Sequence, residues 1–305
     1  DFSATVTCVE GQTISVDRTM SWKGPGAEAG EEHCSVGTTL PSRTWYMPEG
    51  CSAYGFETWL LVQNPNAREA RIGVTYMIEG VGPRTVTRTV PPRARATYNM
   101  ADDIGAFSAS IQVSSDRPVI AERATYRNDR REGQGSIGAT YPSRVFYLPE
   151  GSTAWGYTTY VLVQNPNVNP AEVTLTYMTG SGPVRQRPLA VGPRSRMTVD
   201  AAGVIPGKDF SVKVTATQPV VAERAMYWTS EAGSACHDSI GLPQPHSVFY
   251  LPDGQTGRGW ETFTLVQNPN STRVDVEVVY YGANGSFDVV VRRTLEAGSR
   301  ATFNM

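Results

Sequence analysis

The hexapeptide LVQNPN occurs three times in this chain of 305 residues. Its copies end at Asn66, Asn167 and Asn270, so successive copies lie 101 and 103 residues apart. A Pro-Glu-Gly or Pro-Asp-Gly turn precedes every copy at a similar distance. Self-similarity with a period of about 100 residues indicates tandem domains rather than a short-period solenoid.

The repeat is out of phase with the chain by half a unit. A second signal is a strand that opens on Phe-Ser and leads to an acidic residue followed by Arg, and it returns at 2–18, 107–123 and 210–224. The predicted domains are a C-terminal half at 1–42, complete units at 43–143 and 144–246, and an N-terminal half at 247–305. The 42 and 59 residues of the two halves together match the length of one unit. We therefore expect the second half to be completed by an equivalent of the first.

Each unit is predicted to be all-β. Apolar residues alternate with polar ones at Ile111 and Val113, and again at Val274, Val276 and Val278. This period of two is typical of strands with one buried face. Short strands are separated by Gly-Pro, Asn-Pro and Pro-Glu-Gly turns, and no stretch keeps a helical period. The pattern predicts tandem immunoglobulin-like antiparallel β-sandwiches of about 100 residues each.

The composition and the motifs exclude several classes of function. With 40% hydrophobic residues, 18% charged residues and a net charge of −2, the chain is predicted to be neither disordered nor a nucleic-acid binder. No apolar run has the length of a membrane helix, so we predict no membrane insertion. The chain lacks hydrolase, nucleotide-binding and metalloprotease motifs, and His33, His237 and His246 do not recur in register. We therefore predict no catalytic residue, no cofactor and no metal site.

Four cysteines without CxxC spacing favour two disulfides over a zinc site. Three connectivities are open to them. Cys8 falls at an inward position of its predicted strand, and Cys34 lies near the last strand of the same half-unit, so the favoured first bond joins Cys8 to Cys34. The second would then join Cys51 to Cys236. Disulfides predict an oxidising, extracellular location.

Aromatic residues gather in the loops after the Pro-Glu-Gly turns. Tyr54, Trp155 and Trp260 lie there. Such rings can line a sugar-binding face, but Trp and Tyr are also common where proteins pack together. We favour packing in a core or between domains.

Charged residues recur at fixed places in the units. Structural ion pairs are predicted for Glu122, Arg123, Glu223 and Arg224. The recurring arginines are their expected partners: Arg95, Arg196 and Arg300. Neighbours in a strand face opposite ways, so one charge of each Glu-Arg pair points inward or towards an adjoining domain. Acid–base catalysis needs a suitably placed partner group, and the sequence positions none.

The order of Tyr-Leu-Pro-Glu-Gly, an aromatic-rich strand ending in LVQNPN, and a later Ala-Glu-Arg resembles a known kind of repeat. It is similar to the tandem immunoglobulin-like sandwich repeats of large secreted cell-surface proteins from bacteria such as actinobacteria and Chloroflexota. The resemblance covers the whole chain and implies an extracellular or cell-surface location without implying an activity. The half-unit offset departs from a simple string of complete domains.

A half-sandwich exposes an apolar face and unpaired strand edges, which are costly in water and invite pairing with another chain. We expect the two ends to combine between chains, as in donor-strand complementation. The preferred function is therefore a structural subunit of an extracellular filament or surface fibre, whose partners are copies of itself joined head to tail. Closure of one chain into a three-domain ring stays open.

Two other functions stay open. One is an adhesin or carbohydrate-binding surface module, excised from a longer array, that binds a cell-surface glycan. The other is a secreted β enzyme, which would need a cleft joining Glu150 or Glu223 to another carboxylate.

Overall fold

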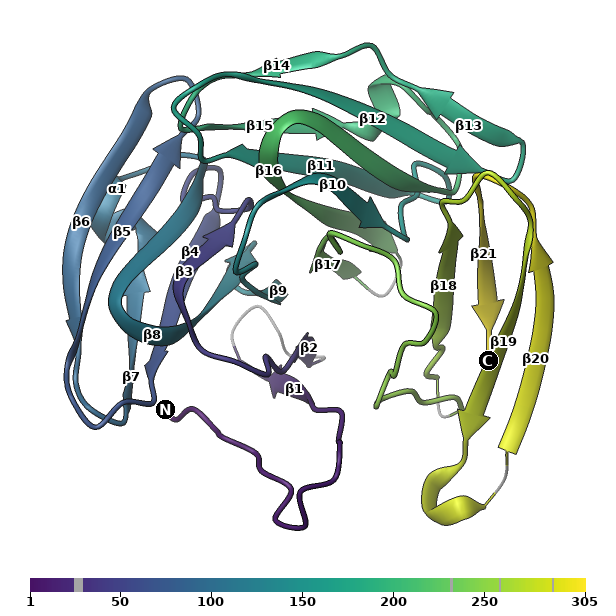
Figure 1. Cartoon of the computed structure of the whole chain (residues 1–305), viewed down its shortest axis with the longest axis horizontal. Helices are drawn as coiled ribbons and strands as arrows, with labels where there is room; N and C mark the ends of the chain where they lie inside the picture. Colours follow the sequence, from purple (N-terminus) through teal and green to yellow (C-terminus); the bar gives the residue numbers. More distant parts are fainter. Residues whose placement is uncertain (25–29, 231–232, 258, 287) are drawn as a thin grey trace.

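The computed structural model describes these residues: 1–24, 30–230, 233–257, 259–286 and 288–305. Strands make up most of them, and the longest described helix, α1 (Met100–Ile104), has five residues. The all-β prediction is therefore confirmed. Among the described residues, none forms a helix of the length and apolarity that a membrane crossing requires. Figure 1 shows the sheets following one another along an arc.

The first unit is a seven-stranded sheet that curls around a core. Its strands are β3 (Ser42–Met47), β4 (Phe56–Asn64), β5 (Ala70–Ile78), β6 (Gly82–Val90), β7 (Ala94–Asn99), β8 (Ala109–Arg127) and β9 (Glu132–Ile137). Their order is β6-β5-β8-β4-β7, and β3 and β9 also pair with β8. The first part of the long β8 pairs with β3 and β5, and its second part pairs with β4 and β9. This strand therefore joins the two sides of the curl.

The second unit is arranged in the same way around an even longer strand, β16. Its elements are β10 (Ser143–Leu148), β11 (Tyr157–Asn165), β12 (Ala171–Thr179), β13 (Gly182–Arg185), β14 (Leu189–Val191), β15 (Ser195–Asp200), η1 (Ala201–Gly203), β16 (Phe210–Ser230) and β17 (Gly233–Ile240). The order is β13-β12-β16-β11-β15, with β10, β14 and β17 attached to β12 or β16.

Alternate residues of the strands point into these cores. In β8, Ala109, Ile111 and Val113 are fully buried, as are Leu60 and Val62 in β4. Residues of β3, β4, β5 and β8 meet in a single cluster, and the second unit has its own cluster. The predicted period of two thus gives each unit one apolar interior.

The ends of the chain are built differently. A hairpin of β1 (Asp17–Trp22) and β2 (Glu31–Val36) follows an N-terminal segment that contains no described strand. The C-terminal segment, residues 247–305, contains β18 (Phe263–Asn268), β19 (Val274–Tyr281), η2 (Ala283–Gly285), β20 (Asp288–Leu295) and β21 (Ser299–Asn304). There β18 pairs with β21 and β19 pairs with β20, as two separate sheets. In Figure 1 the purple N-terminal segment crosses the open side of the arc.

Candidate assembly interface

The three Asn-Pro-Asn turns are held by the first Asn of each. The Nδ2 of Asn64 donates to three backbone oxygens at 2.9 to 3.0 Å, and its Oδ1 accepts hydrogen bonds from Asn66. Asn165 and Asn268 make the equivalent bonds. Asn66 and Asn167 also donate to a carbonyl of the long strand, β8 or β16. In the two complete units, the repeated motif is thus a turn that is hydrogen-bonded to the long strand.

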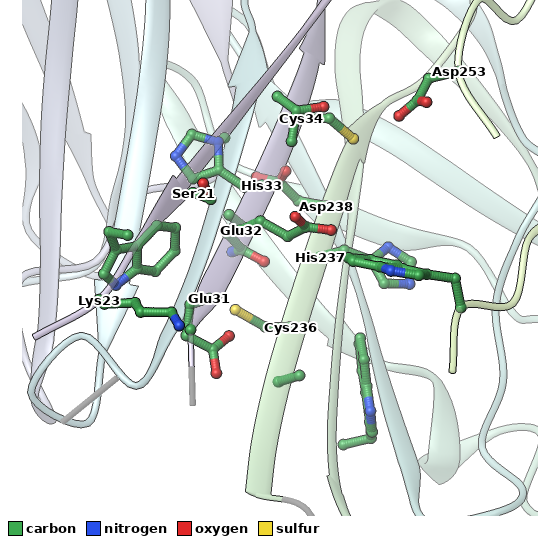
Figure 2. A pocket seen from close by; sticks show the side chains of 18 residues that line it. Ser21, Lys23, Glu31, Glu32, His33, Cys34, Cys236, His237, Asp238 and Asp253 are labelled. Carbon is green, nitrogen blue, oxygen red and sulfur yellow. The ribbon is translucent and has the colours of Figure 1, made fainter. Parts of the chain in front are cut away.

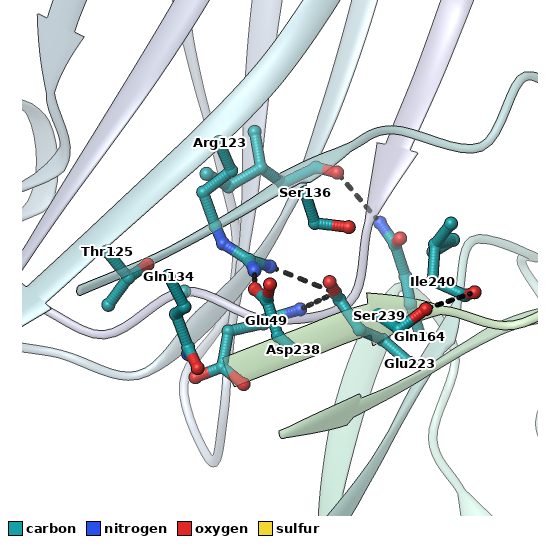
Figure 3. Close-up of polar contacts among 12 residues, drawn as sticks. Glu49, Arg123, Thr125, Gln134, Ser136, Gln164, Glu223, Asp238, Ser239 and Ile240 are labelled. Carbon is teal, nitrogen blue, oxygen red and sulfur yellow. Dashed lines mark hydrogen bonds and ion pairs between the residues drawn. The ribbon is translucent and has the colours of Figure 1, made fainter. Parts of the chain in front are cut away.

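A buried charge cluster joins the first unit to the second. Arg123 of β8 is fully buried, and its guanidinium contacts Glu223 of β16 at 2.9 Å and Asp238 of β17. The backbone N–H of Glu49, in the Pro-Glu-Gly loop, donates to the same Glu223 carboxylate at 3.0 Å. Figure 3 shows these groups converging from both units. The recurring charges therefore link neighbouring units to one another.

Two further contacts fix this joint. Arg196 of β15 donates to the carbonyl of Gly50 at 3.0 Å, and the Nε2 of Gln164 donates to the carbonyl of Ile111 at 3.3 Å. Burial raises the pKa of Glu49, although Arg123 and Arg196 act to lower it. The joint is consequently a buried, charged contact in which each charge depends on its partner.

The N-terminal hairpin docks on the first unit with the same chemistry. Arg18 of β1 binds Glu122 of β8 through two bonds of 2.9 and 2.5 Å. Arg18 and Glu122 correspond in sequence to Arg123 and Glu223 of the next joint. A Cβ on Gly135 would lie 2.7 Å from His33, which shows how closely the hairpin is packed against β9.

The C-terminal segment lacks the central strand that the two units have. Its strands lie in the positions of β6-β5 and β4-β7, but no described strand stands between β18 and β19 where β8 or β16 would lie. Val278 in β19 is therefore only half-buried, whereas its equivalents Val74 and Leu175 are fully buried. The place between β18 and β19 that a central strand would fill is called the groove below, and no described strand occupies it.

The segment before this groove does not form the strand that its sequence equivalents form in the complete units. Phe249 and Leu251 are 55% and 68% exposed, and they lie outside any strand. Their equivalents in β10, Phe146 and Leu148, are buried because β10 pairs with the long β16. Without a central strand, the C-terminal segment cannot form this pairing.

The N-terminal segment carries the matching residues. Ala4 and Val6 correspond to Ala109 and Ile111, which fill the core of the first unit. Val6 is instead 59% exposed. Thr5 accepts a hydrogen bond from Gln63 at 3.4 Å, so the segment lies along the first unit with its apolar side uncovered.

A pocket of about 830 Å³ lies between the N-terminal hairpin, β17 and the loop at Asp253 and Trp260. Figure 2 shows His33, Cys34, Cys236 and His237 among the residues around it. Burial raises the pKa of both thiols, and it lowers the pKa of His33 and of His237 to about 4. A thiol with a raised pKa is a weak nucleophile at neutral pH. No described group of three or more His, Cys, Asp or Glu is placed to hold a metal.

The predicted disulfides are not present, because all four cysteines are free. Cys8 lies in the N-terminal segment outside any strand, where its thiol contacts Glu10, and Cys34 lies on the hairpin. Cys51 is buried in the first unit, and Cys236 lies on β17 of the second. The Cys8–Cys34 prediction assumed that the first strand was folded against its own half-unit, and in the structure it is not.

The three aromatic residues of the loops are all exposed, but only one of them lines the pocket. Tyr54 and Trp155 stand on positive-φ turns and are 89% and 83% exposed. Within this chain neither ring is packed in a core or against a neighbouring unit. Trp260 is also exposed but lines the pocket beside the N-terminal hairpin.

All four residues of the predicted ion pairs form salt bridges, but mostly with other partners than expected. Arg224 contacts Glu150 at 3.0 Å, and Arg196 approaches Glu79 at 3.4 Å. Two residues that were not predicted to form ion pairs complete the joints: Arg18 binds Glu122, and Asp238 binds Arg123. Arg18 could have been predicted, because Asp17 and Arg18 repeat the acidic residue and Arg of the complete units. Asp238 could not be predicted from the repeat, because the equivalent residue of the first unit is Gly135.

Residues 102–225 match the model of a family of unknown function, DUF5719. The match runs from α1 of the first unit, through β8 and β9, into β16 of the second. Among curated proteins, none matches the chain at a significant level.

Two solved structures are each similar to a part of the chain. One is described as Thermotoga maritima 1070, with 17% identity over 34% of this chain and 96% of its own, at a TM-score of 0.32. The other is the sensory rhodopsin transducer of Anabaena, with 20% identity over 27% of this chain and 92% of its own, at a TM-score of 0.24. These similarities assign no function to the chain.

Proposed function

We propose that the chain is a non-catalytic structural subunit of an extracellular filament or surface fibre. Its units at 43–143 and 144–246 would be immunoglobulin-like sandwiches in tandem. The half-units at 1–42 and 247–305 would complete each other between successive copies, head to tail. The observation that carries the proposal is the groove between β18 and β19. In the complete units a central strand fills this place, and in the C-terminal segment no described strand does.

The exposed apolar residues support a second copy as the occupant. Residues 2–18 align with 107–123, which contain most of β8, and with 210–224, which contain most of β16. Cys8 would lie opposite Val278, as Val113 lies opposite Val74. Strand addition of this kind combines main-chain hydrogen bonds with alternate side chains that enter the core.

The arc of Figure 1 supports a coiled rather than a straight assembly. A head-to-tail contact repeated with a constant turn gives a ring when it closes and a helical fibre when it does not. The extracellular location now rests on the resemblance of the repeat alone, because the four free thiols remove the argument from disulfides.

Deletion of residues 1–42 tests the proposal. Full-length protein should form regular fibres in electron micrographs, and the truncated protein should form none while its two complete units stay folded. A peptide of residues 1–42 should cap full-length chains and shorten the fibres. Fibres of normal length from the truncated protein would contradict the proposal.

Tyr54 and Trp155 favour a second candidate, an adhesin or glycan-binding module, because both rings project into solvent from loop tips. Glycan binding that is lost on Trp155→Ala and kept on Val168→Ala would support it. Val168 is an exposed apolar residue of the same unit that lies in the Asn-Pro-Asn turn region.

A further inference from the structure

The joint between the two complete units is held by two side chains of the second unit. Gln164, at the end of β11, donates to the sulfur of Met77 at 3.7 Å, and Arg196 of β15 donates to the carbonyl of Gly50. Gln164 and Arg196 are buried, and Met77 is only 1% exposed. We call the Gln and the Arg the donor face of a unit, and the Met position with the Gly carbonyl its acceptor face.

The joint between the second unit and the C-terminal segment repeats this contact. Gln267, at the end of β18, donates to the sulfur of Met178 at 3.3 Å, and Met178 is only 4% exposed. The strand β21, which carries Arg300, packs on β12 and β16 as β15 packs on β5 and β8. A donor face on an acceptor face is therefore the contact that successive units of this chain share.

The first unit carries a donor face of its own. Gln63 of β4 and Arg95 of β7 have the places of the Gln and the Arg in the two joints. Within the chain Gln63 donates to Thr5 at 3.4 Å, and Arg95 approaches Asp1, whose side chain is 89% exposed, at 3.5 Å. This donor face therefore meets the N-terminal segment instead of the acceptor face of another unit.

The C-terminal segment carries the corresponding acceptor face. Tyr281 has the place of Met77 and Met178, and it is 77% exposed. Gly254 of the Pro-Asp-Gly turn has the place of Gly50. The hydroxyl of a Tyr accepts a hydrogen bond, as the sulfur of a Met does. Its large ring is also of the kind that contributes most to the binding energy of protein interfaces.

A carboxylate beside the donor face has the same difference between the units. Glu223 accepts from a guanidinium and from the backbone N–H of Glu49, in the Pro-Glu-Gly loop of the unit before it. Its equivalent Glu122 accepts from the guanidinium of Arg18, but from no backbone N–H in the part of the chain that the structure describes. Asp253 has the place of Glu49 in the C-terminal segment. The N–H of Asp253 is therefore the group that would complete the set around Glu122.

Figure 1 shows the first unit and the C-terminal segment at opposite ends of the arc, so these two faces of one chain are apart. We infer that the donor face of the first unit binds the acceptor face of the C-terminal segment of a second copy. There Gln63 contacts Tyr281, and Arg95 donates to the carbonyl of Gly254. The two faces together are called the docking surface below.

This inference rests on the proposed function, because residues 1–16 of the copy that offers the donor face enter the groove of the copy that offers the acceptor face. It adds a contact outside the groove. The docking surface uses the contact that the chain already makes twice between its own units, so it fixes the order and the orientation of successive copies.

Chemical crosslinking of the full chain separates the docking surface from the groove. The four native cysteines are replaced by Ser, which the second unit already has at Ser152 in the place of Cys51. The reagent is the shortest bis-maleimide that links the two thiols of a chain carrying Met77→Cys and Gln164→Cys, the positions in contact at the joint. Its length is thus calibrated on a donor face that is bound to an acceptor face.

Two variants are made in this background. The docking variant carries Gln63→Cys and Tyr281→Cys. The groove variant has Cys8 restored and carries Val278→Cys. Each variant is mixed as ¹⁴N- and ¹⁵N-labelled chains, crosslinked, digested and analysed by mass spectrometry, so that links between copies give mixed-isotope peptides.

Links between copies in both variants are the expected result. A link between copies in the groove variant, together with no link or only a link within one chain in the docking variant, overturns the inference and leaves the proposed function standing. Absence of links between copies in both variants overturns both. The matched control pairs Tyr54→Cys with Tyr281→Cys and should give no link, because Tyr54 precedes β4 and Gln63 lies near its other end.

A single substitution gives a second readout that needs no introduced cysteine. Tyr281 is exposed in the single chain, so Tyr281→Ala should leave the fold of the C-terminal segment intact. Because its ring is buried between copies, association measured by sedimentation velocity should weaken about 10-fold or more. Tyr54→Ala removes a comparably exposed ring away from the docking surface and should not change association. A Tyr281→Ala chain that associates as tightly as the unsubstituted protein contradicts the inference.

Discussion

Two regions of the chain carry the same sequence signals but fold differently. One is the joint between the two complete units, and the other is the C-terminal segment. At the joint, every strand has its partner, and Arg123 is buried between Glu223 and Asp238. In the C-terminal segment the same kind of strands form two separate sheets, and residues in core positions stay partly exposed. The difference is one long central strand, which in each unit joins both sides of the curl.

The largest expected effect is the loss of stability when the buried cation of the joint, Arg123, is removed. Arg123→Ala leaves the carboxylates of Glu223 and Asp238 buried without a cation, so the free energy of unfolding should fall by about 3 to 5 kcal/mol. Arg18→Ala removes the equivalent residue from an exposed pair and should cost less than about 1 kcal/mol. Urea denaturation of both variants measures the difference, and equal effects would contradict this distinction.

A charge in the groove should prevent its completion. Val278→Asp places a carboxylate in a position that the central strand of another copy would bury, so association should weaken by at least about 100-fold. Sedimentation velocity measures this loss. Val289→Asp is the matched control, because Val289 lies half-exposed on the neighbouring β20. A Val278→Asp chain that assembles normally would exclude the groove as the interface.

The valines of the repeated hexapeptide allow the same substitution to be compared in a complete unit and in the C-terminal segment. Val62 is fully buried and Val266 only partly. Val62→Ala should destabilise the first unit by about 2 kcal/mol, since it removes buried methyl groups and leaves a cavity. Val266→Ala should cost less than about 1 kcal/mol at dilutions where chains are separate, and more in assembled protein. Thermal unfolding at two concentrations tests this, and equal costs under both conditions would contradict it.

The smallest expected effect concerns His33. Burial and the nearby Arg18 lower the pKa of His33 to about 4. The unfolded chain binds a proton at this histidine below about pH 6.5 while the folded chain does not, so its contribution to stability is lost as the pH falls from about 6.5 towards about 4. Between about pH 7 and pH 5 the loss should be slightly under about 2 kcal/mol.

The matched variant for this prediction is His33→Gln, because Gln134 fills the equivalent place in the next joint and bonds to Tyr227. The variant should lack this part of the acid destabilisation. Denaturation monitored by Trp fluorescence at about pH 7, 6 and 5 gives the comparison. The same slope in both proteins would show that His33 is not buried in its neutral form.

The sequence predicted the strands and the turns because their information is local. Asn64 and its equivalents specify a turn within a few residues, and the alternation around Ile111 specifies which face is buried. The joint was less predictable, because the partner of Arg123 is 100 residues away and Asp238 occurs at that position in one unit only. The misplacement of Cys8 has the same cause, because an inward-facing pattern does not say which other strands a segment packs against.

Sedimentation velocity of the full chain over a wide range of concentration tests the central claim most directly. If residues 1–42 of one copy complete residues 247–305 of the next, the mass should grow in steps of one chain of 33.1 kDa as the concentration rises. The growth should resist added salt, because the contact buries a core instead of exposed charges. A constant mass of one chain at every concentration would contradict the account.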